Sequence, residues 1–292
     1  MESNSYRKIY TLYYLIVFTI SLVILEIPYV EAGRRLTAVA QGPHYEFAAV
    51  GVVTSPGTRV YGGRAVISVW EPAVSRDADS SSAYIQISLN TSAYMGAGWI
   101  VYPERYGDFK PRLYIYWTAD GGLETGCLDL DCEGFQLLDE LSPIGQLIEP
   151  ISDVGGSTWV IDVLIYQISS SGDWQLDIGG KPIGYWPASL FSNTVGAREV
   201  TVGGRVFDSV GNSVHTDTDM GNGLFPTQDD ASSICSIEYV DASFTRRIPD
   251  RDMLVSYVND HLCYDARLLP VTNNVDGVCI LFGGSGRNVD CP

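Results

Sequence analysis

The sequence predicts an all-β protein built as an antiparallel sandwich of two sheets. Apolar and polar residues alternate with a period of two along almost the whole chain, and no window has the spacing of an amphipathic helix. Glycine pairs such as Gly62-Gly63 and Gly179-Gly180 separate or interrupt the short apolar segments. At 292 residues and 46% hydrophobic content, the chain can bury a full core. Many short strands with glycine-rich turns are typical of a two-sheet sandwich.

The first 32 residues have the pattern of a secretory signal peptide. Arg7 and Lys8 precede an apolar run from Ile9 to Leu25, and small residues stand at the two positions that signal peptidase reads. We therefore expect cleavage after Ala32, a connector over residues 33–43 and one folded domain over residues 44–292. The alternative is an uncleaved membrane anchor, because the run is only slightly shorter than the ~20 residues of a spanning helix.

Strands are expected where β-branched and aromatic residues gather between turn residues. The expected strands are Tyr45–Val53, Ala65–Trp70, Ala83–Leu89, Gly98–Tyr102, Arg112–Trp117, Thr158–Gln167, Trp174–Ile178, Lys181–Trp186, Thr201–Phe207, Ser233–Val240 and Gly277–Phe282. The fourth and fifth form a hairpin around Tyr106-Gly107-Asp108 and Lys110-Pro111.

The second strand of this hairpin is aromatic on both faces. Side chains alternate across a sheet, so Leu113, Ile115 and Trp117 take one face. Tyr114 and Tyr116 take the other, together with the threonine that follows Trp117. We expect one face to pack in the core and the other to line a cleft.

Charge and cysteine content limit the environment and the partners. The formal net charge of −17 disfavours nucleic acid and anionic membranes as partners. Six cysteines behind an apolar N-terminus indicate an oxidising compartment. Cys127 and Cys132 are close enough in sequence to staple a tight turn, and the other four cysteines can pair in three ways.

The same residues argue against a metal site. His44, His215 and His261 are scattered along the chain, and no second close cysteine pair accompanies them. Asp217 and Asp219 are followed by too few oxygen ligands for calcium, so a solvated loop is the expectation there. The sequence therefore indicates disulfides and no metal or other cofactor.

A series of segments, in order, resembles the neprosin family of secreted plant proteins. They are YGGRAVISVWEP, GAGW with YPERYGD and YIYWTADG, TGCLDLDCEGF, GDWQL, GYWPASLF, VGGRVFD, HTDTDMGNGLFP and FGGSGRNVDCP. The resemblance covers residues 44–292 and implies a concanavalin-like sandwich with a cleft across one concave face. It also implies secretion to the apoplast or cell wall, and pairing of Cys263 with Cys291, which leaves Cys235 for Cys279.

Neprosins resemble glutamic peptidases that cut after proline in acid. One glutamate acts as the general base on a water, and the other polarises the peptide carbonyl and donates a proton to the leaving nitrogen. The first glutamate position of the family falls here on Gly96, and the second falls on Arg205. Glycine carries no titratable group, and arginine keeps its proton at accessible pH.

Neighbouring carboxylates do not replace the missing pair. No Asp or Glu lies between Asn90 and Tyr102. Glu199 shares the strand face of Arg205 but stands roughly 20 Å along the strand, and Asp208 points to the opposite face. Because each positioned acid or base contributes about 10² to 10⁴ in rate, we expect a catalytically inactive protein. The alternative is an active endopeptidase that uses Glu104, Asp120 or Glu124.

A binding cleft can persist without catalysis. The resemblance places around that cleft Gln86, Trp99, Tyr116, Trp117, Tyr185, Trp186 and Arg205. Aromatic faces suit proline rings and sugar rings, so the expected partners are proline-containing peptides or cell-wall glycans. A place in the core is the alternative for each aromatic residue taken singly. For Arg205, the functional interpretation is a pair with a carboxylate of the bound peptide.

Two further residues complete the sequence predictions. Asn90-Thr91-Ser92 is an N-glycosylation sequon, which implies an exposed loop in a secreted protein. His215 matches a family motif, and we expect a structural role for it near a turn.

Overall fold

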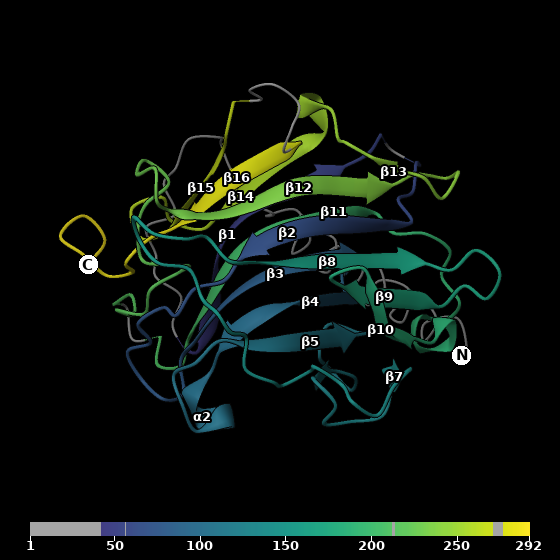
Figure 1. Ribbon diagram of the computed structural model, residues 1–292, viewed down its shortest axis with the longest axis horizontal. Helices are drawn as coiled ribbons and strands as arrows, with labels where there is room; N and C mark the ends of the chain where they lie inside the picture. The colour runs from purple at the N-terminus through teal and green to yellow at the C-terminus, as the bar shows by residue number, and fades with distance from the viewer. Residues whose placement is uncertain (1–41, 56, 212–213, 271–276) are drawn as a thin grey trace, which may run out of the picture. The chain divides into compact units, whose positions relative to one another are not determined.

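Two antiparallel sheets make up the described part of the chain. The computed structural model describes residues 42–55, 57–211, 214–270 and 277–292. The sheets lie one behind the other in Figure 1, which confirms the predicted sandwich. The expected signal peptide over residues 1–32, and residues 33–41 of the expected connector, lie outside the described residues. Within the described ranges, none of the helices is both long enough and apolar enough to cross a bilayer.

The seven-stranded sheet carries Gly96 and Arg205, on which the resemblance places the two glutamate positions of the family. Its order is β14-β1-β11-β3-β4-β5-β6. The strands are β1 (His44–Val53), β3 (Ser80–Ser88), β4 (Tyr94–Val101), β5 (Arg112–Thr118), β6 (Cys127–Leu128), β11 (Glu199–Asp208) and β14 (Leu254–Val258). The hairpin between β4 and β5 contains a single helical turn, α2 (Pro103–Tyr106), which ends at Gly107 with φ of 78°. Glycine favours this left-handed conformation, so it stops the helix there.

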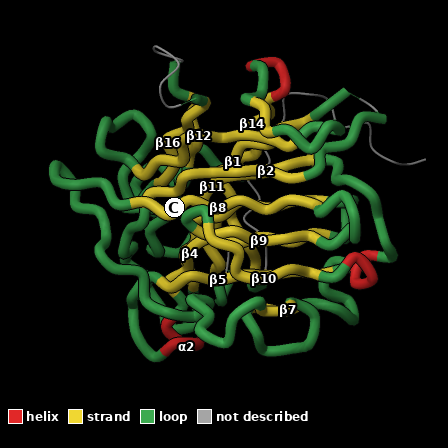
Figure 2. The backbone as a smooth tube through the Cα atoms, turned by 45° about the vertical axis from the view of Figure 1, so that its right-hand side comes forward, coloured by secondary structure: helices red, strands yellow, loops and turns green. Residues whose placement is uncertain are grey.

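The nine-stranded sheet faces the first one. Its order is β15-β16-β12-β2-β8-β9-β10-β7, with β13 paired to β12. The strands are β2 (Gly62–Ser68), β7 (Gln136–Leu137), β8 (Val160–Gln167), β9 (Trp174–Ile178), β10 (Lys181–Trp186), β12 (Ser232–Val240), β13 (Arg246–Arg247), β15 (Asp265–Leu268) and β16 (Val278–Gly283). Two 3₁₀ turns, η1 (Ala188–Phe191) and η2 (Arg251–Met253), lie in the connections, and the tube in Figure 2 shows how little of the chain is helical.

Every strand expected from the sequence is present, and several short ones were missed. The missed strands are β6, β7, β13, β14 and β15. Strands β6, β7 and β13 span two residues each, and most of β14 is exposed, so no alternation of apolar and polar residues marked them.

The core fills the space between the sheets. In β5, Ile115 and Trp117 belong to this core, whereas Tyr114 and Tyr116 belong to a separate cluster on the other face, as the alternation predicted. Trp99 is fully buried, and its Nε1–H donates to the backbone oxygen of Ser68 at 2.8 Å. Because Trp99 lies on β4 and Ser68 ends β2, this hydrogen bond joins the two sheets.

All six cysteines are paired, one pair as closeness in sequence predicted and two as the family resemblance implied. The disulfides are Cys127–Cys132, Cys235–Cys279 and Cys263–Cys291. The second links the neighbouring strands β12 and β16, and the third ties the C-terminal segment back to the residues just before β15.

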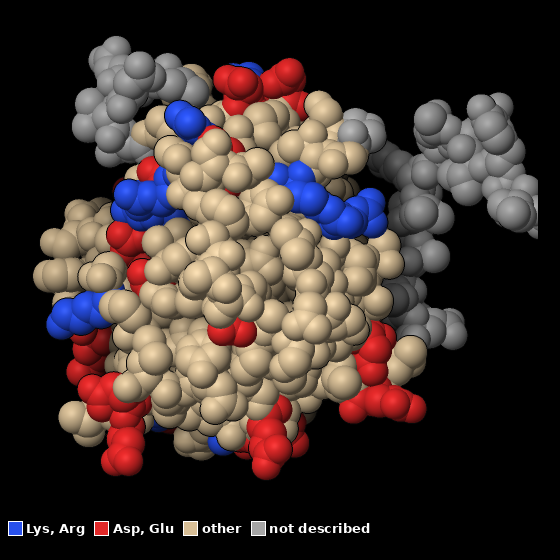
Figure 3. Space-filling view, turned by 90° about the vertical axis from the view of Figure 1, so that its right-hand side faces the viewer, with Lys and Arg blue, Asp and Glu red and all other residues tan. Residues whose placement is uncertain are grey.

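Charge is unevenly spread over the surface. The side of the molecule in Figure 3 is largely uncharged, with Asp and Glu mostly along its lower margin and at its very top, and Lys and Arg mainly across its upper half. The net charge of −17 is therefore not spread uniformly over this side.

The buried Trp99 gives a test of the packing. Trp99→Ala removes a large core side chain and its inter-sheet hydrogen bond, so we expect the free energy of unfolding to fall by about 3–5 kcal/mol. Urea denaturation followed by fluorescence measures it. Trp159→Ala is the matched control, because that side chain is 47% exposed, and it should cost under about 1 kcal/mol. Equal losses for the two variants would contradict the assignment of faces.

Candidate functional site

Gly96 and Arg205 both lie on the outer face of the seven-stranded sheet. Gly96 sits in the middle of β4, in register with Gln86 on β3 and Tyr116 on β5. Arg205 sits on β11, opposite Ser82 of β3. The strand between them, β3, separates the two positions, and side chains must bridge the gap across it.

The ring of Tyr116 occupies the space above Gly96. A Cβ placed on Gly96 would lie 2.5 Å from both Cζ and Oη of Tyr116. The Tyr116 hydroxyl donates to Oε1 of Gln86 at 2.9 Å, and Nε2 of Gln86 donates to Ser88 Oγ at 3.0 Å. The phenol is thus fixed where a side chain at position 96 would begin.

Arg205 is surrounded by four tyrosines, which we call the tyrosine cage. Its Cζ lies 4.9, 5.2 and 4.7 Å from the ring centroids of Tyr45, Tyr84 and Tyr116. Its Nη2 donates to Tyr114 Oη at 3.3 Å. These are cation–π distances, and each such contact stabilises by roughly 0.5–2 kcal/mol. No ion pair joins Arg205 to an acidic residue in the part of the chain that the structure describes.

The electrostatics of the cage leave one net positive charge. Burial raises the pKa of Tyr84, Tyr114 and Tyr116, so these phenols stay neutral. Desolvation opposes the charge of Arg205, but the tyrosines around it hold its pKa above the usual value. The site therefore offers a permanent cation and neutral hydroxyls, and it lacks a group that exchanges protons near neutral or acid pH.

Further aromatic residues extend this surface from β1 to β5. Tyr114 and Tyr116 stack with centroids 5.6 Å apart, and Tyr94 meets Tyr116 edge-on at 6.2 Å. The aromatic face consists of the cage, in which Tyr45 is exposed, together with five half-buried rings, which are Phe47, Tyr94, Tyr102, Tyr106 and Phe207. Its rings present a mixed apolar and hydroxyl surface.

Three of the expected cleft residues lie together on the aromatic face, and the others lie elsewhere in the fold. Gln86, Tyr116 and Arg205 lie on the aromatic face. The prediction was wrong for Trp99, Trp117 and Trp186, which are buried between the sheets. Strand alternation turns Trp99 and Trp117 away from the face that Tyr116 occupies.

Tyr185 also lies away from the aromatic face. It is half-buried on β10 of the other sheet, where it pairs with Gln136 and Gln175 in the strand register. Sequence reasoning missed Tyr45 and Tyr84, which complete the cage. Tyr84 lies two residues from Gln86 on β3, so alternation along that strand could have found it. Tyr45 lies on β1, and only the pairing of β1 with β11 brings it to the same face.

Asp120, one of the carboxylates considered as an alternative catalytic group, is held in a loop by hydrogen bonds. Asp120 accepts hydrogen bonds from the backbone N–H groups of Gly122, Leu123 and Glu124 and from both the backbone and the hydroxyl of Thr125. Desolvation opposes its charge, but these hydrogen bonds lower the pKa of Asp120 to about 2. Such a carboxyl is already ionised in mild acid and cannot serve there as a proton donor.

Glu104 and Glu124 are exposed, and Glu199 lies elsewhere on the sheet. Glu104 accepts from the Tyr102 hydroxyl at 3.4 Å. Glu199 lines a cavity of about 470 Å³ with Arg198 and Tyr257. Burial and the contact with Glu199 raise the pKa of the Tyr257 phenol to about 12. This cavity does not include Gly96 or Arg205.

The structure gives hydrogen-bond or ion-pair partners for the other residues that the sequence analysis named. Asn90 is exposed, and its Oδ1 accepts from the N–H groups of Ser92 and Ala93 in the turn after β3, so glycosylation there stays a prediction. Asp217 pairs with Arg287, and Asp219 accepts from the N–H of Ala73. His215 is buried against Glu46, which is consistent with a structural role.

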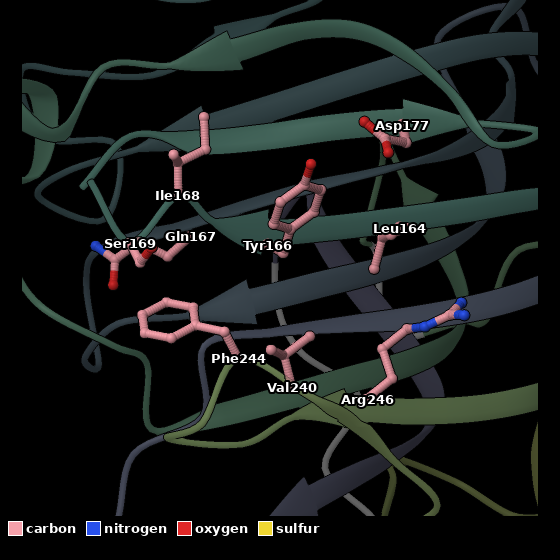
Figure 4. A pocket seen from close by; sticks show the side chains of 9 residues that line it. All are labelled: Leu164, Tyr166, Gln167, Ile168, Ser169, Asp177, Val240, Phe244 and Arg246. Carbon is pink, nitrogen blue, oxygen red and sulfur yellow. The ribbon is translucent and has the colours of Figure 1, made fainter. Parts of the chain in front are cut away.

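A different cavity lies on the outer face of the nine-stranded sheet. It measures about 340 Å³, and Figure 4 shows Tyr166, Val240 and Phe244 around it, with Asp177 and Arg246 at its edge. Gln175 donates to both the Tyr166 hydroxyl and Asp177. This mainly apolar hollow contains none of the residues expected from the sequence to bind a ligand.

The fold and the site define a two-sheet β-sandwich protein whose aromatic outer face carries a caged arginine. The model of the Neprosin family matches residues 77–285, and the chain belongs to the neprosin family.

Solved structures are similar over most of the chain. A scytalido-glutamic peptidase with a transition state analog inhibitor has 11% identity and a TM-score of 0.46, covering 83% of this chain and 99% of that chain. A complex of SCP-B, a member of the Eqolisin family of peptidases, with the tripeptide Ala-Ile-His has 7% identity and a TM-score of 0.40, with the same coverage.

The close approach of Tyr116 to Gly96 predicts a coupling between them. Gly96→Ala should reduce the free energy of unfolding by about 1–3 kcal/mol, because the new Cβ collides with the ring. In a Tyr116→Ala background the same change should cost less than about 0.5 kcal/mol, as a double-mutant cycle in urea would measure. Gly98→Ala is the control, since its Cβ would meet the backbone oxygen of Ala83 and Tyr116→Ala cannot relieve that clash.

The hydrogen bonds to Asp120 predict its titration. The pKa of its carboxyl, followed by NMR, should be about 2, and Thr125→Val should raise it by removing one donor. Because the folded-state pKa is depressed, the stability that this group contributes is present above pH 4 and is lost as the pH falls toward 2. A pKa near the ordinary value of about 3.9 would contradict the described loop.

Proposed function

We propose that this protein is a secreted member of the neprosin family that binds peptides and does not hydrolyse them. The observation that carries the proposal is the occupancy of the two acid positions of the family. The ring of Tyr116 stands above Gly96, and the other position holds Arg205 inside the tyrosine cage. Peptide hydrolysis by two carboxyls needs one group that accepts a proton and one that donates it. Neither side chain does either at accessible pH.

The surroundings of these positions support inactivity as well. Gln86 and Ser82 on β3 and the tyrosine cage on β1, β3 and β5 surround the two positions, and these side chains are neutral in acid. The carboxyls that remained as alternatives are a loop-capping aspartate and exposed glutamates. An active endopeptidase would have to assemble its acids away from the aromatic face.

Peptide binding is the function that the aromatic face supports best. Proline rings pack well on tyrosine and phenylalanine, whose electron-rich faces also meet the polarised C–H bonds of the proline ring. Arg205 adds a planar set of donors that suits a carboxylate, and the structure gives it no acidic partner among the described residues. We infer that the ligand is a peptide with proline and a carboxylate, the carboxylate lying over Arg205. Cell-wall glycans are the second candidate, because sugars stack on the same rings.

Secretion is part of the proposal. Three disulfides suit an oxidising compartment, and the N-terminal residues have the composition of a signal peptide. The family resemblance favours the apoplast or cell wall as the place of action.

Hydrolysis and binding of a peptide can be measured separately. The purified protein is incubated with a proline-containing peptide from pH 3 to pH 7, and mass spectrometry should find no cleavage. Calorimetry should show binding of the peptide with a free C-terminal carboxylate and weaker binding of its amide. Arg205→Gln should weaken binding of the acid form by about 10- to 100-fold and leave the amide nearly unchanged, because only the charged hydrogen bonds are lost.

The controls decide between the candidates. Arg246→Gln removes an exposed arginine on the other sheet and should not change peptide binding. Tyr45→Ala opens the exposed side of the cage and should weaken both peptide forms by loss of stacking. Clean acid-dependent cleavage by the wild type would refute the inactive protein, and binding of an oligosaccharide without any peptide binding would favour the glycan.

A further inference from the structure

Three side chains of metal-ligating type meet on the core-facing side of β1 and β11. His44 and Asp208 are opposite each other in the strand register, and Glu46 lies two residues along β1. One ring nitrogen of His44 and one oxygen each of Glu46 and Asp208 all lie within 4.8 Å of one another. Glu46 is 2% exposed and Asp208 is fully buried. This cluster is on the opposite face of the sheet from the tyrosine cage.

Asp208 has one oxygen that the protein leaves unpaired. Its Oδ1 accepts from Nη1 of Arg76 at 3.1 Å and from the N–H groups of Val210 and Gly211. Its Oδ2 is buried and has no hydrogen-bond partner among the described residues. A fully buried carboxylate oxygen without a partner is rare, because burial removes the water that would otherwise hydrate it. A bound cation would supply the missing partner.

His44 is already oriented as a ligand. Its Nδ1 lies 3.0 Å from the backbone oxygen of Gly42, so this nitrogen carries the proton and donates it to the carbonyl. The lone pair is then on Nε2, which lies 3.7 Å from Oε1 of Glu46. A backbone carbonyl on the far nitrogen is a common way to fix the tautomer of a metal-binding histidine.

Glu46 is also held in place from outside the cluster. The Nδ1 of His215 lies 2.9 Å from Oε2 and 3.1 Å from Oε1 of Glu46, and Oε1 also lies 3.7 Å from Nε2 of His44. His215 is buried, so it acts here as a positioning residue for the glutamate. Folding thus gathers two of the three histidines of the chain, although they are far apart in sequence.

Negative charge exceeds fixed positive charge in this region. Asp79 and Asp208 are both fully buried, and they share one guanidinium, that of Arg76. In the part of the chain that the structure describes, Glu46 forms ion pairs with the imidazoles of His44 and His215 and with no guanidinium or ammonium group. Three buried carboxylates therefore face a single permanent cation, and a divalent cation would reduce the imbalance.

We propose that His44, Glu46 and Asp208 bind a zinc ion. One imidazole nitrogen and two carboxylate oxygens form a mixed donor set that Zn²⁺ accepts, with a water or a second carboxylate oxygen in the fourth position. Ligand atoms of a tetrahedral zinc site are about 3.5 Å apart, so the 3.7 Å between His44 and Glu46 needs little change. Calcium and magnesium prefer larger all-oxygen or hydrated sites. The role is structural, since the site is buried and ties β1 to β11.

Calorimetry and X-ray absorption test this site in the full secreted chain. Protein treated with a chelator and then dialysed should bind one Zn²⁺ per chain, with Ca²⁺ and Mg²⁺ giving no heat. The zinc absorption edge should show nitrogen and oxygen ligands without sulfur, because every cysteine is in a disulfide. Asp208→Asn and His44→Gln should each weaken zinc binding by at least about tenfold.

A matched control exists in the third histidine. His261 pairs with Asp265 at the surface, 3.0 Å apart, and His261→Gln should leave zinc binding unchanged. Circular dichroism confirms that each variant is folded, and the absorption spectrum of the wild type tests the site even if Asp208→Asn fails to fold. Absence of one-to-one zinc binding by the wild type, sulfur ligands at the edge, or an equal loss in His261→Gln would overturn the proposal.

Discussion

The constraint on which the whole molecule depends is the alternation of side chains across each strand. Along β5 it sends Trp117 to the core and Tyr116 to the outer face, one residue apart. Along β11 it sends Arg205 to the tyrosine cage and Asp208 to the buried polar cluster. A shift of one residue in register would exchange these faces and put a guanidinium in the core. Packing between the sheets therefore also determines which residues can meet a ligand.

Gly96 and Arg205, the residues at the positions where the resemblance places the glutamates of the family, are physically coupled through Tyr116. With glycine at position 96, the ring of Tyr116 can occupy the space above β4, and its hydroxyl can donate to Gln86. The same ring then offers its face to Arg205 at 4.7 Å. A glutamate at position 96 would need the space that the ring occupies, and a glutamate at position 205 would lose the attraction that a cation has for aromatic faces. Gly96, Tyr116 and Arg205 therefore fit together as one arrangement, and the residues at positions 96 and 205 are not independent of each other.

The sequence predicted the sandwich, the main strands and the division of faces in β5, because period two and glycine turns are local signals. The disulfide pairing came from the family resemblance. The sequence failed on Trp99 and Trp186, since an aromatic residue in a family motif can as well be core as cleft. It could not place His44 beside Asp208 either, because that contact depends on β1 pairing with the distant β11. Contacts between strands far apart in sequence have no local pattern.

Strand β11 also explains why two opposite charges three residues apart do not neutralise each other. Arg205 and Asp208 lie on opposite faces of one sheet, so the backbone of the sheet separates the guanidinium from the carboxylate. Asp208 takes its cation from Arg76 instead, which approaches from the core side. Arg205 consequently has no acidic counter-ion among the described residues, and the phenols around it are neutral. A guanidinium held among neutral phenols attracts carboxylates by its charge, whereas neither the guanidinium nor the phenols exchange a proton near neutral or acid pH.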